Sequence, residues 1–185
     1  MPASRVLLIR HGESTWNAER RWQGWGDPPL SAQGRAQAGE LATRLAGQGV
    51  AQLVSSDLAR AAQTAQILGD ALGLVPTLDA RLRERDLGRW SGLTESQIVA
   101  AFGDEIERLR AREPGLRPGG GESHEAFAAR AIPALTDAAA SAVGAAIAIV
   151  THLGVIRLVM PELRPGNAEI VAIDRDRLLA ALAAA

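Results

Sequence analysis

Cysteine, lysine and tyrosine are all absent from the 185-residue chain, and every one of its 20 basic residues is arginine. The lack of cysteine excludes disulfides, a thiolate nucleophile and a zinc or iron–sulfur site with cysteine ligands. The lack of lysine and tyrosine excludes a Schiff-base lysine, the lysine of a P-loop and a tyrosine nucleophile. Any phosphate must therefore be held by arginine, histidine, short polar side chains or backbone N–H groups, and the planar arginine fork suits phosphate oxygens well.

Excess charge and long apolar runs are lacking too. The formal net charge is −1, with 21 acidic residues against 20 basic ones, which argues against nucleic acid or an anionic membrane surface as a partner. No apolar run is long enough to span a bilayer, and the N-terminal run is too short for a signal peptide. We therefore expect a cytoplasmic protein that forms one domain over residues 1–185.

The most informative stretch is VLLIRHGESTWN, at residues 6–17. Its four leading apolar residues indicate a strand buried on both faces of a sheet, with Arg10, His11 and Gly12 at the carboxyl end. Open α/β sheets bind ligands at that end of their strands. Ser14 is a candidate N-cap for a short helical turn, whose free N–H groups would face an anion. Taken alone, the Arg-His-Gly sequence is equally compatible with a purely structural role.

A second strand-to-helix junction also carries a cation. The strand predicted at 52–56 leads into a helix over 57–73, for which Asp57 is the expected N-cap, and Arg60 lies in its first turn. A cation in that position opposes the helix dipole. Either a bound anion or a nearby acid such as Asp57 would offset this unfavourable interaction.

A second histidine follows a buried strand near the other end of the chain. The apolar run at 146–150 leads directly into Thr151 and His152. Because parallel strands end at the same edge of a sheet, we expect the rings of His11 and His152 to lie close together there.

The remaining elements alternate in the manner of an α/β fold. Further strands are expected at 74–78 and 169–174, and a charged irregular segment at 82–92. Further helices are expected at 31–47, at 94–112 with a break at Gly103, at 123–142 and, because of its alanine content, at 178–184.

Six segments stand in a characteristic order along the chain: RHGESTWN, QGWGDPPLSAQGRAQA, SSDLARAAQTA, LRERDLGRWSG, PGGGES and VTHLGVIR. Together they resemble the histidine phosphatase superfamily, also called phosphoglycerate mutase-like, over about residues 6–167. The resemblance implies an α/β fold, namely a three-layer α/β/α sandwich around a mostly parallel central sheet.

The resemblance also implies the roles of the site residues. His11 would attack phosphorus and form a phosphohistidine, Glu84 would donate a proton to the leaving oxygen, and Arg10, Arg60 and His152 would complete the catalytic set. The residues expected to bind the substrate are Arg10, Asn17, Gln23, Gly24, Arg60, His152 and Leu153. Relatives commonly have Gly-Gly after the second histidine, where this chain has Leu153-Gly154. No metal or other cofactor is implied.

Elementary chemistry requires the same residue types. Imidazole is nucleophilic only when it is neutral and one ring nitrogen is held as N–H, which a backbone carbonyl near Gly12 could do. Charge develops on the phosphoryl oxygens, where Arg10, Arg60 and a protonated His152 would stabilise it. An alkoxide leaves poorly, so an acid such as Glu84 must donate a proton. The competing interpretation of the charged segment around Glu84 is a solvated face.

We expect a metal-independent phosphomonoesterase of the histidine acid-phosphatase type that acts on a small phosphorylated metabolite. Related mutases carry a longer insertion after the segment that ends at Gly92, and its absence here favours water as the acceptor. The alternatives are a cofactor-dependent phosphoglycerate mutase and a non-catalytic phospholigand-binding module. The sequence leaves open whether the chain forms a homodimer. Four arginines near the PGGGES loop would meet an anionic tail of the substrate, unless they form a solvated helix end: Arg108, Arg110, Arg112 and Arg117.

Overall fold

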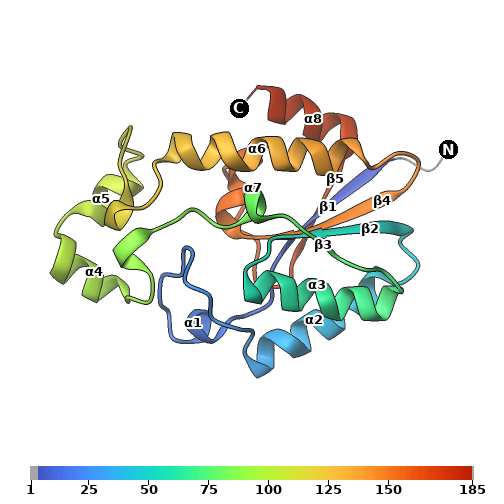
Figure 1. The fold of residues 1–185 in the computed structure, drawn as a ribbon, viewed down its shortest axis with the longest axis horizontal. Coiled ribbons are helices and arrows are strands. Elements are labelled where there is room, and N and C mark those ends of the chain that lie inside the picture. The colour runs from blue at the N-terminus through green and yellow to red at the C-terminus, as the bar shows by residue number, and fades with distance from the viewer. Residues whose placement is uncertain (1–3, 185) are drawn as a thin grey trace.

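A five-stranded sheet forms the centre of the structure, a computed structural model that describes residues 4–184 (Figure 1). The strands lie in the order β3-β2-β4-β1-β5. β2 is parallel to β3 and to β4, β4 is parallel to β1, and β5 runs antiparallel along β1. The expected mostly parallel sheet is therefore confirmed. The strands are β1 (Arg5–Arg10), β2 (Val50–Ser55), β3 (Thr77–Leu78), β4 (Ala146–Thr151) and β5 (Ile170–Asp174).

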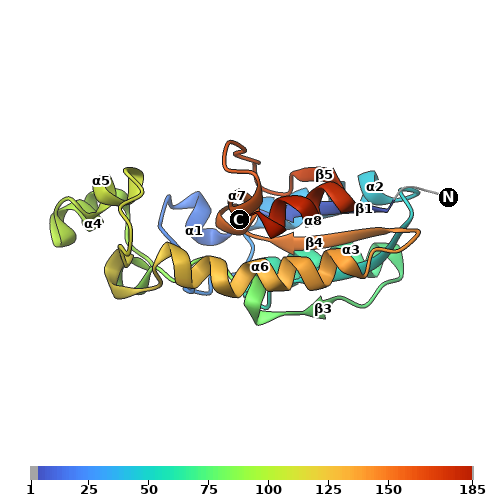
Figure 2. The ribbon, with the colours of Figure 1, turned by 90° about the horizontal axis from the view of Figure 1, so that it is seen from above.

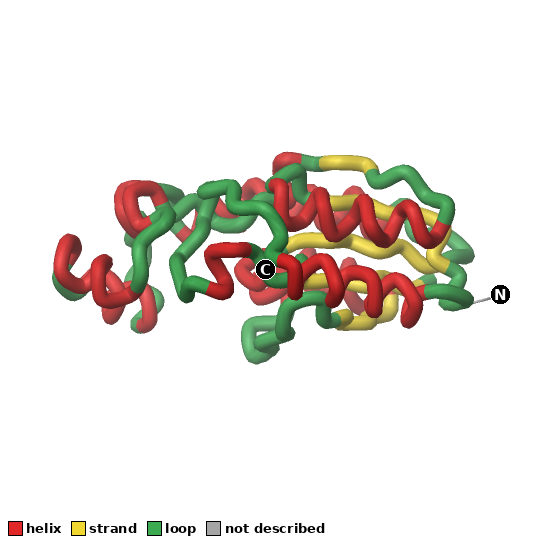
Figure 3. The backbone as a smooth tube through the Cα atoms, turned by 90° about the horizontal axis from the view of Figure 1, so that it is seen from below, coloured by secondary structure: helices red, strands yellow, loops and turns green. Residues whose placement is uncertain are grey.

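Helices cover both faces of the sheet, which gives the expected α/β/α layers (Figures 1 and 2). α2 and α3 lie on one face, and α6, α7 and α8 on the other. In the tube view the strands lie between helices in one half of the molecule, and the other half consists of long loops and short helices (Figure 3). The helices are α1 (Thr15–Ala18), α2 (Ala32–Leu45), α3 (Ala59–Leu72), α4 (Glu95–Phe102), α5 (Glu105–Arg110), α6 (His124–Ala140), α7 (Leu153–Val159) and α8 (Arg175–Ala183).

The apolar run in β1 divides its side chains between two cores. Val6 and Leu8 pack with α6, α7 and α8, whereas Leu7 and Ile9 pack with α2 and α3. All four side chains are almost completely buried. A strand with two apolar faces is what a sheet covered on both sides requires, since successive side chains point in opposite directions.

The predicted strand at 74–78 is shorter in the structure. Leu74 donates its N–H to the carbonyl oxygen of Gly69 and so closes the end of α3, and Val75 is 90% exposed. Pro76 has no N–H to contribute to a sheet. Pairing with β2 therefore begins at Thr77.

Asp57 does not cap α3 as predicted. The N-cap is Leu58, which makes no side-chain capping bond, and the N–H of Ala59 donates to Asp27 Oδ1 at 2.6 Å. The carboxylate of Asp57 binds the guanidinium of Arg83 instead, through bonds of 2.7 and 2.5 Å. A cap supplied by a distant loop leaves no local sequence signal.

The other segments that the sequence predicts to be helical are helical in the structure. The 94–112 segment divides into α4 and α5 at Gly103, which has a φ of +63°. The C-terminal segment is helical as α8, and Asp174 caps it by accepting from the N–H groups of Asp176 and Arg177. α7 was not predicted. None of the helices within residues 4–184 is long and apolar enough to cross a membrane.

The segment from 83 to 123 forms an outer lobe beyond the carboxyl ends of the strands (Figure 1). It contains α4, α5 and short 3-10 turns, and it has its own small apolar cluster of Leu87, Trp90, Ile98 and Ile106. The lobe therefore overhangs the edge of the sheet at which the sequence places the reactive residues.

Candidate active site

The parallel pairing of β1 and β4 brings the two histidines together. Arg10 lies opposite Thr151 in the register, and the N–H of His11 donates to the carbonyl oxygen of Thr151 at 3.0 Å. The ring centroids of His11 and His152 are 5.2 Å apart, and the two residues are only 3% and 0% exposed. The expected proximity of the two rings is confirmed.

The His11 ring is held in one tautomer by its own backbone neighbour. Nδ1 lies 2.7 Å from the carbonyl oxygen of Gly12, which can only accept. Nδ1 must therefore carry the proton, and Nε2 presents a lone pair. Gly12 is fixed in turn, because its N–H donates to Thr64 Oγ1 at 3.0 Å and a Cβ would lie 2.6 Å from the carbonyl oxygen of Gly34.

Backbone carbonyls hold the two arginines of the site. The Nη atoms of Arg60, a residue that is 1% exposed, donate to the carbonyl oxygens of Gly24 and Gly26, both at 2.9 Å. Arg10 Nη1 donates to the carbonyl oxygen of Pro165 at 2.9 Å. Arg60 is therefore not the solvated partner of Asp57, which was the structural alternative for this position.

Three buried nitrogens of the site make no hydrogen bond within the described residues: Arg10 Nε, Arg60 Nε and His152 Nδ1. The two arginine nitrogens are donors, and His152 Nδ1 is a donor when Nε2 accepts from the hydroxyl of Ser56. Leaving a buried donor unsatisfied costs about 1–3 kcal/mol in folding free energy. Arg10, Arg60 and His11 line one cavity of about 800 Å³. An anion with several oxygens beside His11 would supply the missing acceptors.

Burial and the neighbouring cations determine the protonation of both rings. Burial, followed by the charges of Arg60 and Arg10, lowers the pKa of His11 well below 6.5. Burial and Arg60 also lower the pKa of His152 well below 6.5, and burial lowers the pKa of Arg60 to about 10. At pH 7 His11 is therefore neutral and nucleophilic. The protein's own groups disfavour the protonated His152 expected from the sequence. A positive charge on this ring therefore needs a bound dianion beside it.

The remaining expected site residues divide into two groups. Gln23, Gly24, Glu84 and Leu153 line the same cavity as His11. Asn17 lies in a polar network instead: its Oδ1 accepts from the N–H of Ser14 at 3.1 Å and from Asn167 Nδ2 at 3.3 Å. Ser14 also donates to Gln23 Oε1 at 2.7 Å, and it caps α1 as predicted.

Two backbone N–H groups orient the carboxylate of Glu84. Oε1 accepts from the N–H of Arg85 at 2.8 Å, and Oε2 accepts from the N–H of Gly154, in the first turn of α7, at 3.0 Å. A Cβ at Gly154 would collide with Glu84 Oε1. In the Leu153-Gly154 pair, a side chain at the second position would therefore displace the Glu84 carboxylate, whereas Leu153 contributes a side chain to the cavity wall.

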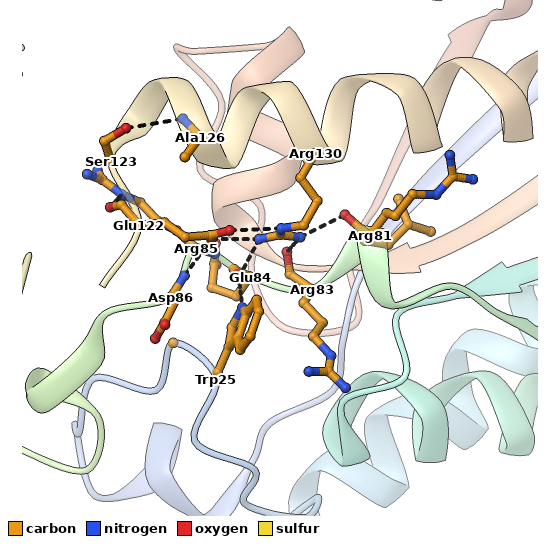
Figure 4. Close-up of polar contacts among 12 residues, drawn as sticks. Trp25, Arg81, Arg83, Glu84, Arg85, Asp86, Glu122, Ser123, Ala126 and Arg130 are labelled. Carbon is orange, nitrogen blue, oxygen red and sulfur yellow. Dashed lines mark hydrogen bonds and ion pairs between the residues drawn. The ribbon is translucent and has the colours of Figure 1, made fainter. Parts of the chain in front are cut away.

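The backbone that carries Glu84 is clamped by Arg130 of α6 (Figure 4). The guanidinium of Arg130 donates to the carbonyl oxygens of Arg81, Arg83 and Glu84 at 2.8, 3.1 and 3.2 Å. It also binds both carboxylate oxygens of Glu122, at 2.9 and 2.7 Å. The segment around Glu84 is therefore a fixed part of the structure and not a solvated face.

Trp25 reaches the same backbone from the other side (Figure 4). Its Nε1 donates to the carbonyl oxygen of Glu84 at 2.8 Å. The guanidinium carbons of Arg83 and Arg130 lie 5.1 and 5.5 Å from the centroid of its ring, within the range of cation–π attraction.

Several residues that support the site were not predicted from the sequence. His152 Nε2 bonds Ser56 Oγ at 2.9 Å, and Thr64 donates to the carbonyl oxygen of Arg60 at 2.7 Å. The position of Ser56 directly after strand β2 and the helical i, i+4 spacing from Arg60 to Thr64 could have indicated these two residues. The charged side chain of Arg130 on the apolar face of α6 could have indicated that residue. Asn167, whose Nδ2 donates to the carbonyl oxygen of His11 at 3.1 Å, had no local signal.

Comparison with known proteins gives consistent matches. Residues 6–173 match the family model of the histidine phosphatase superfamily, branch 1. A probable phosphoglycerate mutase GpmB of Enterobacter sp. (strain 638) is 40% identical over 153 residues, which cover 80% of this chain and 69% of that protein.

Solved structures agree with the fold. A mycobacterial glucosyl-3-phosphoglycerate phosphatase, solved with VO3, is 36% identical and has a TM-score of 0.79 over 91% of this chain and 90% of its own. The YhfR protein of Bacillus stearothermophilus is 29% identical and has a TM-score of 0.83 over 92% of this chain and 90% of its own. The fold class expected from the sequence is therefore confirmed.

The lowered histidine pKa values predict a loss of stability in mild acid. An unfolded histidine takes up a proton below its ordinary pKa of 6.5, whereas folded His11 and His152 do not. These two rings therefore do not reduce the free energy of unfolding above pH 6.5. Below pH 6.5 each ring lowers it by about 1.4 kcal/mol per pH unit. Urea unfolding at pH 7.5, 6.5 and 5.5 should show this loss. His124→Asn, at an exposed position, should leave the slope unchanged, and an unchanged slope in a His11→Asn/His152→Asn variant would contradict the assignment.

The close approach of Gly154 to the Glu84 carboxylate predicts that a single methyl group at position 154 disturbs the proposed proton donor. Gly154→Ala should displace the Glu84 carboxylate without unfolding the protein, because Gly154 has no positive φ. Turnover of an alkyl phosphate should fall, by up to the loss of about 10²–10⁴-fold expected for Glu84→Gln, with a markedly smaller loss for p-nitrophenyl phosphate, whose phenolate leaves without a proton. Leu153→Ala is the matched control and should not change the ratio of the two rates. Equal losses for both substrates in Gly154→Ala would show that Glu84 acts through structure alone.

Proposed function

Because the chain belongs to the histidine phosphatase superfamily, we propose that it is a phosphomonoesterase that hydrolyses a small phosphorylated metabolite through a phosphohistidine. One observation carries the proposal: a neutral imidazole in a fixed tautomer adjoins a buried set of nitrogens without acceptors. A phosphoryl group bound there would place phosphorus before His11 Nε2 and its oxygens against Arg10, Arg60 and His152.

In the first step, the lone pair of His11 Nε2 forms a bond to phosphorus as the bond from phosphorus to the alcohol oxygen breaks. Protonated Glu84 gives its proton to that oxygen, so a neutral alcohol leaves. Arg10 and Arg60 stabilise the charge that spreads over the phosphoryl oxygens, and they need no reorganisation because backbone carbonyls already hold them.

In the second step, water attacks the phosphohistidine. The Glu84 carboxylate takes a proton from this water as the bond from phosphorus to nitrogen breaks, which releases phosphate and returns His11 to the neutral form. Each group then stands as it did before the first step. The N–H groups of Arg85 and Gly154 hold Glu84 in place for both proton transfers.

A phosphoglycerate mutase is the second candidate, because a relative named as a probable phosphoglycerate mutase GpmB is 40% identical. A mutase must keep the phosphohistidine from water while the substrate is turned round for return transfer. Two features favour hydrolysis: the segment between Gly92 and the 118–123 loop is short, and similar solved structures include a phosphatase.

A single incubation separates these functions. The purified protein is mixed with 3-phosphoglycerate and a catalytic amount of 2,3-bisphosphoglycerate, and both inorganic phosphate and 2-phosphoglycerate are measured. Release of phosphate is expected, and His11→Ala should lower it by roughly three or more powers of ten. Formation of 2-phosphoglycerate without phosphate release would establish the mutase. If the protein binds members of a panel of metabolite phosphates but hydrolyses none of them, the non-catalytic phospholigand-binding module is the function that remains.

Activity should survive an excess of EDTA. In the proposed mechanism Arg10, Arg60 and a His152 that becomes protonated beside the bound phosphoryl dianion provide the positive charge that a metal ion supplies in other phosphatases. Within residues 4–184, no group of three or more acids and histidines is arranged to hold a metal ion. The measurement compares kcat/KM before and after dialysis against EDTA. Complete loss that Mg²⁺ or Zn²⁺ restores would refute the mechanism.

A further inference from the structure

The two ring nitrogens of His152 have very different surroundings. Nε2 lies 2.9 Å from the hydroxyl oxygen of Ser56, whereas Nδ1 is buried and makes no hydrogen bond with any residue that the structure describes. His152 and Ser56 are both 0% exposed. Because burial and the charge of Arg60 lower the pKa of this ring well below 6.5, only one of its nitrogens carries a proton at pH 7. Which nitrogen carries it depends on the hydrogen bonds of Ser56.

The hydroxyl oxygen of Ser56 already accepts one hydrogen bond. The N–H of Leu58, the N-cap of α3, donates to it at 3.3 Å. Among the described residues, Nε2 of His152 is the one other hydrogen-bond partner of this hydroxyl. A hydroxyl carries a single hydrogen, and buried polar groups are almost always paired. The hydrogen of Ser56 therefore has an acceptor only when Nε2 presents a lone pair to it.

The two tautomers of His152 differ in the number of groups that they leave without a partner in the described structure. With the proton on Nδ1, the hydroxyl of Ser56 donates to Nε2, and the Nδ1–H is the one group left over. With the proton on Nε2, Nδ1 lacks a donor and the hydroxyl hydrogen of Ser56 lacks an acceptor. An oxygen of a bound anion accepts from an Nδ1–H, whereas it is repelled by a lone pair on Nδ1. The Nδ1–H tautomer is therefore the one in which protein and anion together pair every group.

The backbone holds Ser56 rigidly beside the ring. The N–H of Ser56 donates to the carbonyl oxygen of Val150 at 3.0 Å, and its carbonyl oxygen accepts from the hydroxyl of Ser55 at 2.8 Å. Val150 belongs to β4, the strand that leads into His152. The hydroxyl oxygen thus lies between the strand that carries the ring and the start of α3. Its position is set by segments of the sheet and not by a mobile side chain.

We propose that Ser56 is a positioning residue, which donates a hydrogen bond to Nε2 of His152 and thereby keeps Nδ1 as an N–H donor for an oxygen of the bound phosphoryl group. The tautomer is a property of the free protein, and its use on a phosphoryl oxygen rests on the proposed function. When the ring takes up a second proton beside the dianion, the hydroxyl of Ser56 can turn and accept from the Nε2–H. A hydroxyl therefore serves both charge states of the ring.

His11 and His152 are then held in opposite ways. A carbonyl oxygen, which can only accept, fixes the proton of His11 on Nδ1 and leaves a lone pair on Nε2 for phosphorus. A hydroxyl that donates to Nε2 of His152 leaves a proton on Nδ1 for the phosphoryl oxygens. The type of group behind each ring thus determines whether the ring attacks the phosphoryl group or binds it.

Nitrogen NMR of the free protein tests the tautomer directly. The chain has three histidines, His11, His124 and His152, so their ring signals can be assigned with His11→Asn and His124→Asn. In long-range proton–nitrogen spectra of histidine-labelled protein, recorded in a mildly alkaline buffer without phosphate, Nε2 is recognised by its coupling to both carbon-bound ring protons. Nε2 of His152 should have the chemical shift of an unprotonated nitrogen, and Nδ1 that of a protonated one. The opposite result would overturn the proposal, and the measurement needs no substitution at Ser56.

Removal of the hydroxyl should release the tautomer. In Ser56→Ala the two nitrogen shifts of His152 should move toward each other, because both tautomers then become populated. Ser55→Ala is the matched control: Ser55 is also 0% exposed, but its hydroxyl donates to a carbonyl oxygen and not to the ring. An unchanged His152 spectrum in Ser56→Ala, or an equal change in Ser55→Ala, would show that Ser56 does not orient the ring.

Affinity for inorganic phosphate separates the positioning role from the phosphatase function. In titration calorimetry, Ser56→Ala should bind phosphate about tenfold more weakly than the unaltered protein, whereas Ser55→Ala should bind it equally well. If this holds while the unaltered protein hydrolyses no metabolite phosphate, the positioning role stands and the phosphatase function fails. If the unaltered protein hydrolyses such esters while Ser56→Ala binds phosphate with full affinity, the phosphatase function stands and the positioning role is refuted.

Discussion

The hydrogen bond between His11 Nδ1 and the carbonyl oxygen of Gly12 is the interaction on which the rest of the site depends. It fixes the proton on one nitrogen and leaves the other as a nucleophile. The bond exists because Gly12 is tied to Thr64 of α3 and approached closely by Gly34 of α2. Two helices of one layer thus determine the tautomer of a residue at the end of β1.

The second constraint is the positive charge buried beside this ring. The guanidinium of Arg60 is hydrogen-bonded to carbonyl oxygens and not to a carboxylate, so it keeps its charge without giving up its affinity for an anion. An ion pair at the same position would hold the arginine equally well and would compete with the phosphoryl group. Orientation by neutral dipoles is therefore what makes a buried cation usable for binding.

Much of this arrangement could be predicted because it follows from short stretches of sequence. The apolar run before Arg10 and the similar run before Thr151 each indicate a strand covered on both faces, and the ends of parallel strands must meet. The contacts that could not be predicted join distant segments. Asp27 caps α3 in place of Asp57, and Arg130 holds the carbonyl oxygens around Glu84. The lowered pKa of His152 could not be predicted for a related reason, since burial among arginines is visible only in three dimensions.

Arg130 joins the two ends of the outer lobe. It donates to the carbonyl oxygen of Glu84, where the chain enters the lobe, and to the carboxylate of Glu122, where the chain returns from it. Glu84, the proposed proton donor, is thereby anchored to α6 at the base of the lobe, and its position does not depend on the amino acids further out. Residues around α4 and α5 can accumulate substitutions, and even change length, while the chemical step is preserved. Such a division allows descendants of one enzyme to acquire new substrates through changes in a single inserted segment.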